Sequence, residues 1–173
     1  MDRVQIVKMR YLWLIGGALL GFLVGSLTQS VHASDENGDV FCLAQNIYFE
    51  SANQPLAGKI AVAQVVQNRV EHRAYPDTIC GVVYDAKWKE NWKGNMMPVR
   101  NMCQFSWFCD GKSDIPEDSE TWESSYRLAE QILYGVYGDI TEGATHYHND
   151  SVHPYWADSL NETVVINNHI FYK

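Results

Sequence analysis

The most informative stretch of this 173-residue chain is AQNIYFESANQPLAGKIAVAQVVQNRV, residues 44–70. It joins the end of one helix to the whole of a second helix. Leu43, Ile47 and Glu50 are spaced i, i+4 and i+7, so they share one face of a helix that begins near Val40. Glu50 therefore extends the apolar stripe of this helix at its carboxyl end.

A second helix is predicted after a short break. Pro55 suits the first turn of a helix, and Asn53 or Gln54 could cap it. The helix is predicted to run to about Arg73, and its apolar positions wrap around most of its circumference. We therefore expect a central, largely buried helix. Its apolar positions are Ala57, Ile60, Ala61, Ala63, Val65, Val66 and Val70.

An irregular region follows these helices. After a short segment over residues 78–84, residues 85–117 carry Lys, Trp, Asn, Gly and Pro without clear periodicity. A stretch this long without structure indicates a functional surface or a lid. A last long helix is predicted from Asp118 or Ser119 to about Tyr137, with Gly138 as its stop.

The C-terminal composition is typical of strands. Three short segments are predicted as strands, over residues 144–148, 163–166 and 169–172. The pair Asn167-Asn168 separates the last two and indicates a hairpin. The chain as a whole is predicted to be one α+β domain that is mostly helical.

The charge is uneven along the chain. The formal net charge is −8, from 13 Lys and Arg against 21 Asp and Glu, which argues against nucleic acid as a partner. Residues 34–173 hold 10 basic and 20 acidic residues, whereas residues 1–33 hold three basic residues and one acid. The aromatic content of 13% argues against a disordered chain.

The first 33 residues have the layout of an export signal. Arg3, Lys8 and Arg10 precede an uncharged run over residues 11–27, and Val31-His32-Ala33 resembles a cleavage site. A cleaved signal peptide and an uncleaved signal anchor in the inner membrane both fit, because the run could just span a bilayer. Residues 34–39 are predicted as a linker and residues 40–173 as the exported domain, which acts in the periplasm or cell wall.

Four cysteines lie in the exported part. Cys103 and Cys109 enclose only five residues, so a local bridge is sterically easy, and Cys42 with Cys80 would then form a second bridge. Four cysteines allow three pairings, so other pairings and free buried thiols stay open. A zinc site is disfavoured because no C-x-x-C pair occurs.

Glu50 is the first candidate for chemistry. Desolvation on an apolar helix face and the negative end of the helix dipole would both raise the pKa of its carboxyl. A carboxyl that stays protonated near neutral pH can serve as a general acid. The competing interpretation is a glutamate at a frayed helix end, facing water.

Two further groups are candidates for binding. The segment Gln104-Phe105-Ser106-Trp107-Phe108 pairs aromatic rings with short polar groups, which suits sugar rings, although it could equally fill the core under a loop. His146 and His148 alternate and could face one side of a strand, but no third metal ligand stands at a recognisable spacing. No metal and no cofactor are expected.

Five blocks in this order resemble the cell wall hydrolases of the spore cortex-lytic type, the SleB/CwlJ-like family. They are residues 44–70 quoted above, YPDTICGVVY (75–84), CQFSW (103–107), GATHYHN (143–149) and NNHIFYK (167–173). Glu50 stands at the family's catalytic glutamate. The chain departs from the family in Ser51-Ala52-Asn53-Gln54, where Ala-Arg-Gly-Glu is usual, and in Asn167, where Gly is usual.

The resemblance implies a lysozyme-like fold, related to lytic transglycosylases, with a small C-terminal β-hairpin. It implies cleavage of the MurNAc–GlcNAc bond of peptidoglycan through one essential carboxyl, Glu50. The groove would be built from residues 104–107 and 145–149. The expected substrate contacts are Gln104, Phe105, Ser106, Trp107, His146 and Tyr147.

Several alternatives stay open at this point. The chain could be a lytic transglycosylase or a true hydrolase, a non-catalytic glycan-binding module, or a metal-dependent amidase or peptidase using the late histidines. A monomer is expected. A small domain behind a Gly-rich apolar segment resembles the signal-anchor-release endolysins of phages, and it equally suits a bacterial exported wall enzyme.

Overall fold

The structure is a computed structural model that describes residues 36–173, and all of these belong to one compact unit. The predicted signal peptide or signal anchor, residues 1–33, lies outside the described residues. Within residues 36–173, no helix is long and apolar enough to cross a membrane.

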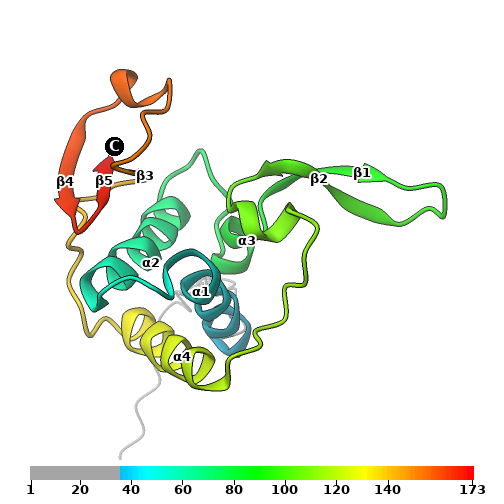
Figure 1. The fold of residues 1–173 in the computed structure, drawn as a ribbon, viewed down its shortest axis with the longest axis horizontal. Coiled ribbons are helices and arrows are strands. Elements are labelled where there is room, and N and C mark those ends of the chain that lie inside the picture. Colours follow the sequence, from blue (N-terminus) through cyan, green and yellow to red (C-terminus); the bar gives the residue numbers. More distant parts are fainter. Residues whose placement is uncertain (1–35) are drawn as a thin grey trace, which may run out of the picture. The chain divides into compact units, whose positions relative to one another are not determined.

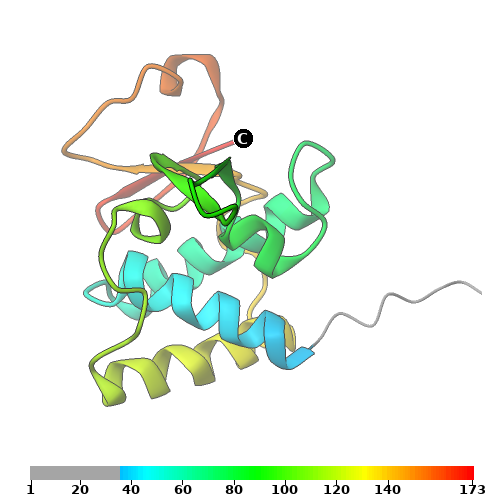
Figure 2. The same ribbon diagram turned by 90° about the vertical axis from the view of Figure 1, so that its right-hand side faces the viewer.

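Within residues 36–173, four α-helices form the main body. They are α1 (Glu36–Ser51), α2 (Leu56–Glu71), the short α3 (Ile79–Val83) and α4 (Ser119–Leu133). α1 packs against the other three, and its residues Leu43, Ala44 and Ile47 are completely buried. Figures 1 and 2 show α4 and the C-terminal strands on opposite sides of the pair formed by α1 and α2.

α2 is the central buried helix that its sequence predicts, because it is covered on two faces. Ile60, Ala63 and Val66 face the helical core, whereas Ala61 and Val65 pack against the C-terminal sheet. All five are at most 6% exposed. Alanine and valine side chains are short, so neighbouring elements can approach this helix closely from both sides.

The C-terminal strands form a three-stranded antiparallel sheet. Its strands are β3 (His146–Asn149), β4 (Glu162–Ile166) and β5 (His169–Tyr172), in the order β3-β5-β4. The predicted hairpin at Asn167-Asn168 is confirmed between β4 and β5, and Asn167 has a φ of 54°. Asparagine tolerates this left-handed conformation better than most residues other than glycine, so it can occupy this turn position. The sheet is larger than the predicted hairpin because β3 pairs with β5.

The interpretation of residues 85–117 as irregular is wrong for most of the segment. The strands β1 (Ala86–Glu90) and β2 (Met96–Cys103) pair into an antiparallel hairpin, and the 3-10 helix η1 (Ser106–Cys109) follows it. Figure 1 shows this hairpin extending away from the helices. Most of its side chains are exposed, so no buried face imposes the alternation of apolar and polar residues from which strands are predicted.

Helix ends differ from the predictions in three places. α1 begins at Glu36, four residues before the expected start. Neither Asn53 nor Gln54 caps α2, because Pro55 stands at the N-cap and no side chain accepts a bond there. α4 stops at Leu133 because Gly135, with a φ of 73°, closes the helix earlier than the predicted stop at Gly138.

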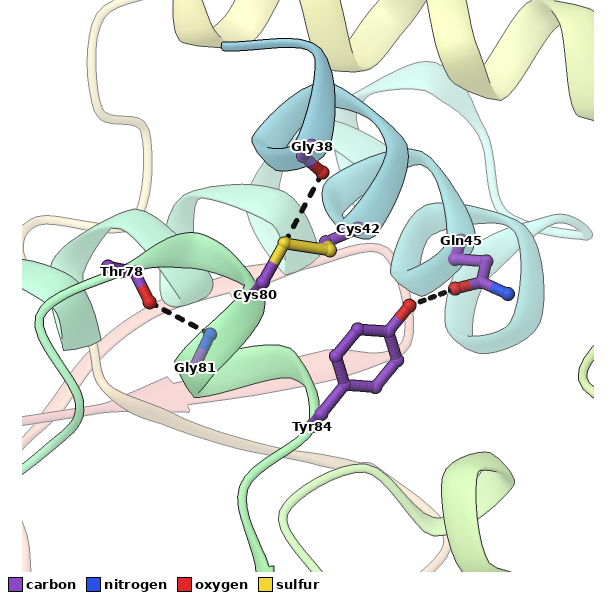
Figure 3. Close-up of a disulfide and its surroundings, with 7 residues drawn as sticks. All are labelled: Gly38, Cys42, Gln45, Thr78, Cys80, Gly81 and Tyr84. Carbon is purple, nitrogen blue, oxygen red and sulfur yellow. Dashed lines mark hydrogen bonds between the residues drawn. A yellow bond between two sulfur atoms is a disulfide. The ribbon is translucent and has the colours of Figure 1, made fainter. Parts of the chain in front are cut away.

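Both proposed disulfides are present. Cys42–Cys80 joins α1 to α3, with its half-cystines 38 positions apart, and Cys103–Cys109 joins the end of β2 to η1. Cys80 Sγ lies 3.3 Å from the carbonyl oxygen of Gly38, at the start of α1 (Figure 3). Thr78 caps α3 by accepting a hydrogen bond from Gly81 N. The first disulfide therefore fixes the short α3 against the helix that carries Glu50.

Candidate active site

Glu50 is the next-to-last residue of α1 and is half-buried. Burial raises the pKa of its carboxyl above the ordinary value, because the anion loses hydration. A hydrogen bond from Tyr147 and the positive charge of Arg69 act in the opposite direction and are weaker than burial. The direction agrees with the expectation from the sequence, and the structure adds two groups that stabilise the anion.

Tyr147 reaches Glu50 from β3. Its hydroxyl donates a hydrogen bond of 3.2 Å to Glu50 Oε2. Burial and the nearby carboxyl raise the pKa of Tyr147 well above its usual value, so the hydroxyl keeps its proton and serves as a donor. The tyrosine ring packs against His169 and Phe171 of β5, which holds it in the sheet.

Arg69, near the end of α2, is a buried cation that sequence reasoning missed as a site residue. It is 6% exposed, and its Nε donates a bond of 2.8 Å to the carbonyl of Thr145, directly before β3. The guanidinium carbon lies 5.3 Å from the ring centres of both Tyr75 and Phe105. Its only sequence signal is a basic residue inside a helix that is apolar on most sides.

A cavity of about 280 Å³ opens beside Glu50. Its apolar wall is Phe49 and Trp107, whose rings stack with centres 4.8 Å apart. Its other lining residues are polar: Glu50, Ser106, Asp110, Lys112, Ser113 and Asp114. A cavity with an aromatic wall and several hydrogen-bonding groups suits a sugar ring.

Three residues of α1 bond to the loop and 3-10 helix that line this cavity, or to the chain directly after them. Gln45 donates a bond of 2.8 Å to the carbonyl of Asp114, and it accepts a bond from the Tyr84 hydroxyl (Figure 3). Asn46 accepts a bond of 3.1 Å from Trp107 Nε1. The Tyr48 hydroxyl accepts bonds from two backbone N–H groups directly before α4, at 3.1 and 3.2 Å. One helix therefore carries Glu50 and positions the chain opposite to it.

Two further carboxyl groups line the same cavity, although the sequence shows no second carboxyl at a convincing position. Partial burial and the negative charge of Asp110 raise the pKa of Asp114. Hydrogen bonds from Lys112 lower the pKa of Asp110, and Lys112 Nζ lies 3.4 Å from it. These residues were missed because they lie in a loop without periodicity, and the contact between Gln45 and Asp114, which places Asp114 near α1, joins residues 69 positions apart.

The structure brings together only some of the residues predicted to bind substrate. Ser106 and Trp107 line the cavity, and Tyr147 contacts Glu50. Phe105 is 2% exposed and packs in the core beneath Arg69. Gln104 is exposed, and its backbone N–H donates to the carbonyl of Asp85.

His146 is adjacent to Tyr147 in β3, so its side chain points to the other face of the strand. There it contacts Tyr75, at 3.4 Å from the hydroxyl, and packs against Trp156. Burial and the charge of Arg69 lower its pKa, so it is neutral near pH 7. In this structure His146 therefore supports the sheet beside Arg69.

The other late histidines also have structural partners. His148 is buried, with Nε2 3.0 Å from the Tyr172 hydroxyl and Nδ1 2.9 Å from the carbonyl of Asn149. His153 pairs with Asp158 at 2.9 Å. Between Glu36 and Lys173, no group of three or more His, Cys, Asp or Glu side chains is arranged to hold a metal ion.

Comparison with known proteins identifies the family. The Cell Wall Hydrolase family model matches residues 53–172. This chain belongs to that family. The matched range begins three residues after Glu50, so it contains Arg69, the cavity loop and Tyr147 but not the candidate acid itself.

The relatives of this cell wall hydrolase include spore cortex-lytic enzymes. The enzyme from Halalkalibacterium halodurans is 29% identical over 143 residues, which are 82% of this chain and 37% of the relative. The enzyme from Oceanobacillus iheyensis is 25% identical over 152 residues, 86% of this chain and 46% of the relative. The chain therefore spans less than half the length of these two relatives.

Solved structures support the same fold. The catalytic domain of the germination-specific lytic transglycosylase SleB from Bacillus anthracis has a TM-score of 0.58 at 26% identity, covering 83% of this chain and 98% of that one. The catalytic domain of the Bacillus cereus SleB protein has a TM-score of 0.56 at 24% identity, covering 79% and 91%. The α+β, lysozyme-like fold that the resemblance implies is confirmed.

Proposed function

We propose that the domain cleaves the glycan strands of peptidoglycan at the MurNAc–GlcNAc bond, as a lytic transglycosylase with Glu50 as its acid and base. The observation that supports this most directly is a carboxyl at the end of α1, with a pKa raised by burial, beside a cavity of sugar-ring size. Family membership and the SleB relatives support a reaction on the cell wall.

In the first step, protonated Glu50 donates its proton to the glycosidic oxygen. The bond from C1 of MurNAc to that oxygen breaks, and GlcNAc leaves with a free 4-hydroxyl. Positive charge develops at C1, and Glu50 becomes a carboxylate. Tyr147 and Arg69 stabilise that carboxylate, so they favour proton transfer at the moment when burial alone would oppose it.

In the second step, the 6-hydroxyl of the same MurNAc attacks C1. Its proton passes to the Glu50 carboxylate, which regenerates the acid, and the product is a 1,6-anhydro sugar. No water molecule is consumed. One carboxyl is sufficient because it acts first as acid and then as base.

Digestion of purified, membrane-free sacculi tests this proposal. The full chain should release soluble muropeptides that carry 1,6-anhydro ends by mass spectrometry. Glu50→Gln should slow release about 10²–10⁴-fold, the usual contribution of a general acid. Glu90→Gln, at an exposed glutamate of β1, is the matched control. Unchanged lysis by Glu50→Gln would refute the role of Glu50, and binding without release would identify a glycan-binding module.

A muramidase is the second candidate, because Asp110 and Asp114 line the same cavity as Glu50. A hydrolase that inverts the anomeric carbon uses a second carboxylate to activate water. In that case the products carry reducing ends, and Asp114→Asn slows their release about as strongly as Glu50→Gln. A transglycosylase yields anhydro ends and tolerates Asp114→Asn far better.

We further propose that the domain works outside the cytoplasm. Its two disulfides support this, because disulfides form and persist in oxidising compartments. Fractionation of expressing cells, followed by N-terminal sequencing of the mature protein, tests it. A new N-terminus near residue 34 indicates a cleaved signal peptide, an intact one in the membrane fraction indicates a signal anchor, and a purely cytoplasmic protein refutes export.

A further inference from the structure

The β1–β2 hairpin carries the most conspicuous exposed apolar groups that the catalytic proposal does not use. Trp92 at its tip is 89% exposed. Met96, Met97 and Met102 of β2 are 59%, 48% and 49% exposed. Tryptophan and methionine side chains are large and apolar, so a cluster of them in water indicates an interaction surface.

These apolar groups lie on both faces of the hairpin. Met96 pairs with Glu90, and Met97 pairs with Lys89. Paired residues of an antiparallel ladder lie on the same face, and neighbours alternate, so Met96 and Met97 point in opposite directions. A glycan strand bound along the hairpin would contact the side chains of one face only. A lipid layer that surrounds the tip would contact the apolar side chains of both faces.

The hairpin is also basic, whereas the rest of the domain is acidic. Residues 86–103 hold four basic residues, Lys87, Lys89, Lys93 and Arg100, against one acid, Glu90. Residues 34–85 and 104–173 together hold 6 basic and 19 acidic residues. The segment with an excess of basic residues, which attracts an anionic surface, is therefore also the segment that exposes Trp92 and the methionines.

Hydrogen bonds fix the conformation of the hairpin tip. Asn91 Oδ1 accepts hydrogen bonds from Lys93 N and Asn95 N at 2.9 and 3.0 Å, and the backbones of Asn91 and Asn95 also bond. The Lys93 ammonium lies 4.8 Å from the centre of the Trp92 ring. Tryptophan beside lysine is a combination typical of the interface between lipid headgroups and acyl chains.

We propose that the β1–β2 hairpin is a membrane-contact arm, which inserts Trp92 and its flanking methionines at the surface of a bilayer containing anionic lipid. The lysines contact the lipid phosphates, and the apolar groups enter the acyl boundary from both faces of the ribbon. This contact is separate from the cavity at Glu50, so it orients the domain without taking part in bond cleavage.

Bromolipid quenching of Trp92 in the full chain tests this proposal. Vesicles of phosphatidylcholine with phosphatidylglycerol are prepared with and without bromine on the acyl chains. The emission of wild type minus that of Trp92→Phe isolates Trp92 from the other tryptophans, including Trp13 in the N-terminal run. We expect bromine to reduce the Trp92 emission at least twofold. Equal Trp92 emission in the two vesicle types would overturn the proposal.

A charge-reversal pair tests the electrostatic part. Lys87→Glu with Lys89→Glu should reduce the quenching of Trp92 at least threefold. Arg73→Glu with Arg127→Glu makes the same change of charge at exposed residues elsewhere and should leave quenching intact. Equal effects of the two pairs would overturn the specific role of the hairpin.

Digestion of membrane-free sacculi separates this arm from a glycan subsite. Trp92→Ser should digest sacculi at the wild-type rate, because the arm is expected to contact lipid only. Slower digestion by this variant, without quenching in the wild type, would assign the hairpin to the glycan and overturn the proposal. The digestion of sacculi by the wild type tests the catalytic proposal, independently of whether the hairpin binds lipid.

Discussion

The Tyr147 hydroxyl donates a hydrogen bond of 3.2 Å to Glu50 Oε2, joining two residues that are 97 positions apart in the chain. The bond connects the last turn of α1 with β3. It stabilises the carboxylate form of Glu50, whereas burial favours the protonated form. The opposition of these two effects suits the acid and base roles proposed for Glu50.

Tyr147→Phe should therefore change both the rate and the pH profile. The carboxylate loses a hydrogen-bond donor, so the pKa of Glu50 rises further. Because a general acid is active while protonated, the pH at which activity falls on the alkaline side should move upward. The maximal rate should fall roughly tenfold or more, because the carboxylate formed in the first step is less stabilised. Sacculus digestion measured from pH 4 to 9 checks both effects.

Tyr155→Phe is the matched control, since Tyr155 is 92% exposed. It should leave the rate and the profile unchanged. An alkaline limb of Tyr147→Phe that stays in place, or moves to lower pH, would contradict the role given to this hydroxyl.

Trp107→Phe should destabilise the domain by about 1–3 kcal/mol. The indole N–H is the donor to Asn46 Oδ1, and Asn46 is completely buried. Asn46 Nδ2 already has no hydrogen-bond partner, so the substitution leaves this side chain without the bond that holds it. The free energy of unfolding in urea checks this prediction. Trp92→Phe, at an 89% exposed position, should change stability by less than about 0.5 kcal/mol.

The two disulfides should differ in their contribution to stability. The half-cystines of Cys42–Cys80 are 38 positions apart, and those of Cys103–Cys109 are six apart. Restriction of the unfolded chain predicts about 4 kcal/mol for the longer loop and about 2 kcal/mol for the shorter one. Urea unfolding of the two paired Cys→Ala variants measures this difference. A larger loss from the short loop would show that local packing, rather than chain entropy, dominates.

Local patterns predicted the two helices that carry Glu50 and Arg69. The spacing of Leu43, Ile47 and Glu50 located the end of α1, and the apolar residues of α2 predicted its burial, because both depend only on near neighbours. The Asn167-Asn168 turn was visible for the same reason.

Long-range relations were not predictable in the same way. Asp114 is held at the cavity by a hydrogen bond from the Gln45 side chain, 69 positions earlier, to its backbone carbonyl. Arg69 is near Glu50 because α2 packs beside α1. The β1–β2 hairpin was missed because its side chains face water on both sides, so no periodic pattern marks its strands. His146 and Tyr147 were predicted together, yet alternation in β3 sends their side chains to opposite faces.

Glu50→Gln should stabilise the domain at neutral pH while it removes activity. Burial raises the pKa of Glu50 in the folded chain above the ordinary value of 4.5. As the pH rises from 4.5 through the raised pKa, the folded state holds more protons at this site than the unfolded state, so stability falls with pH. Above the raised pKa the loss stays constant. An amide carries no charge at any pH and can still accept the bond from Tyr147, so Glu50→Gln avoids this loss.

Urea unfolding of both proteins at pH 4 and pH 8 checks the difference, with Glu90→Gln as the exposed control. The stability gain of Glu50→Gln should be present at pH 8 and absent at pH 4. If the free energy of unfolding of the wild type instead rises relative to that of the variant as pH rises, Tyr147 and Arg69 outweigh burial.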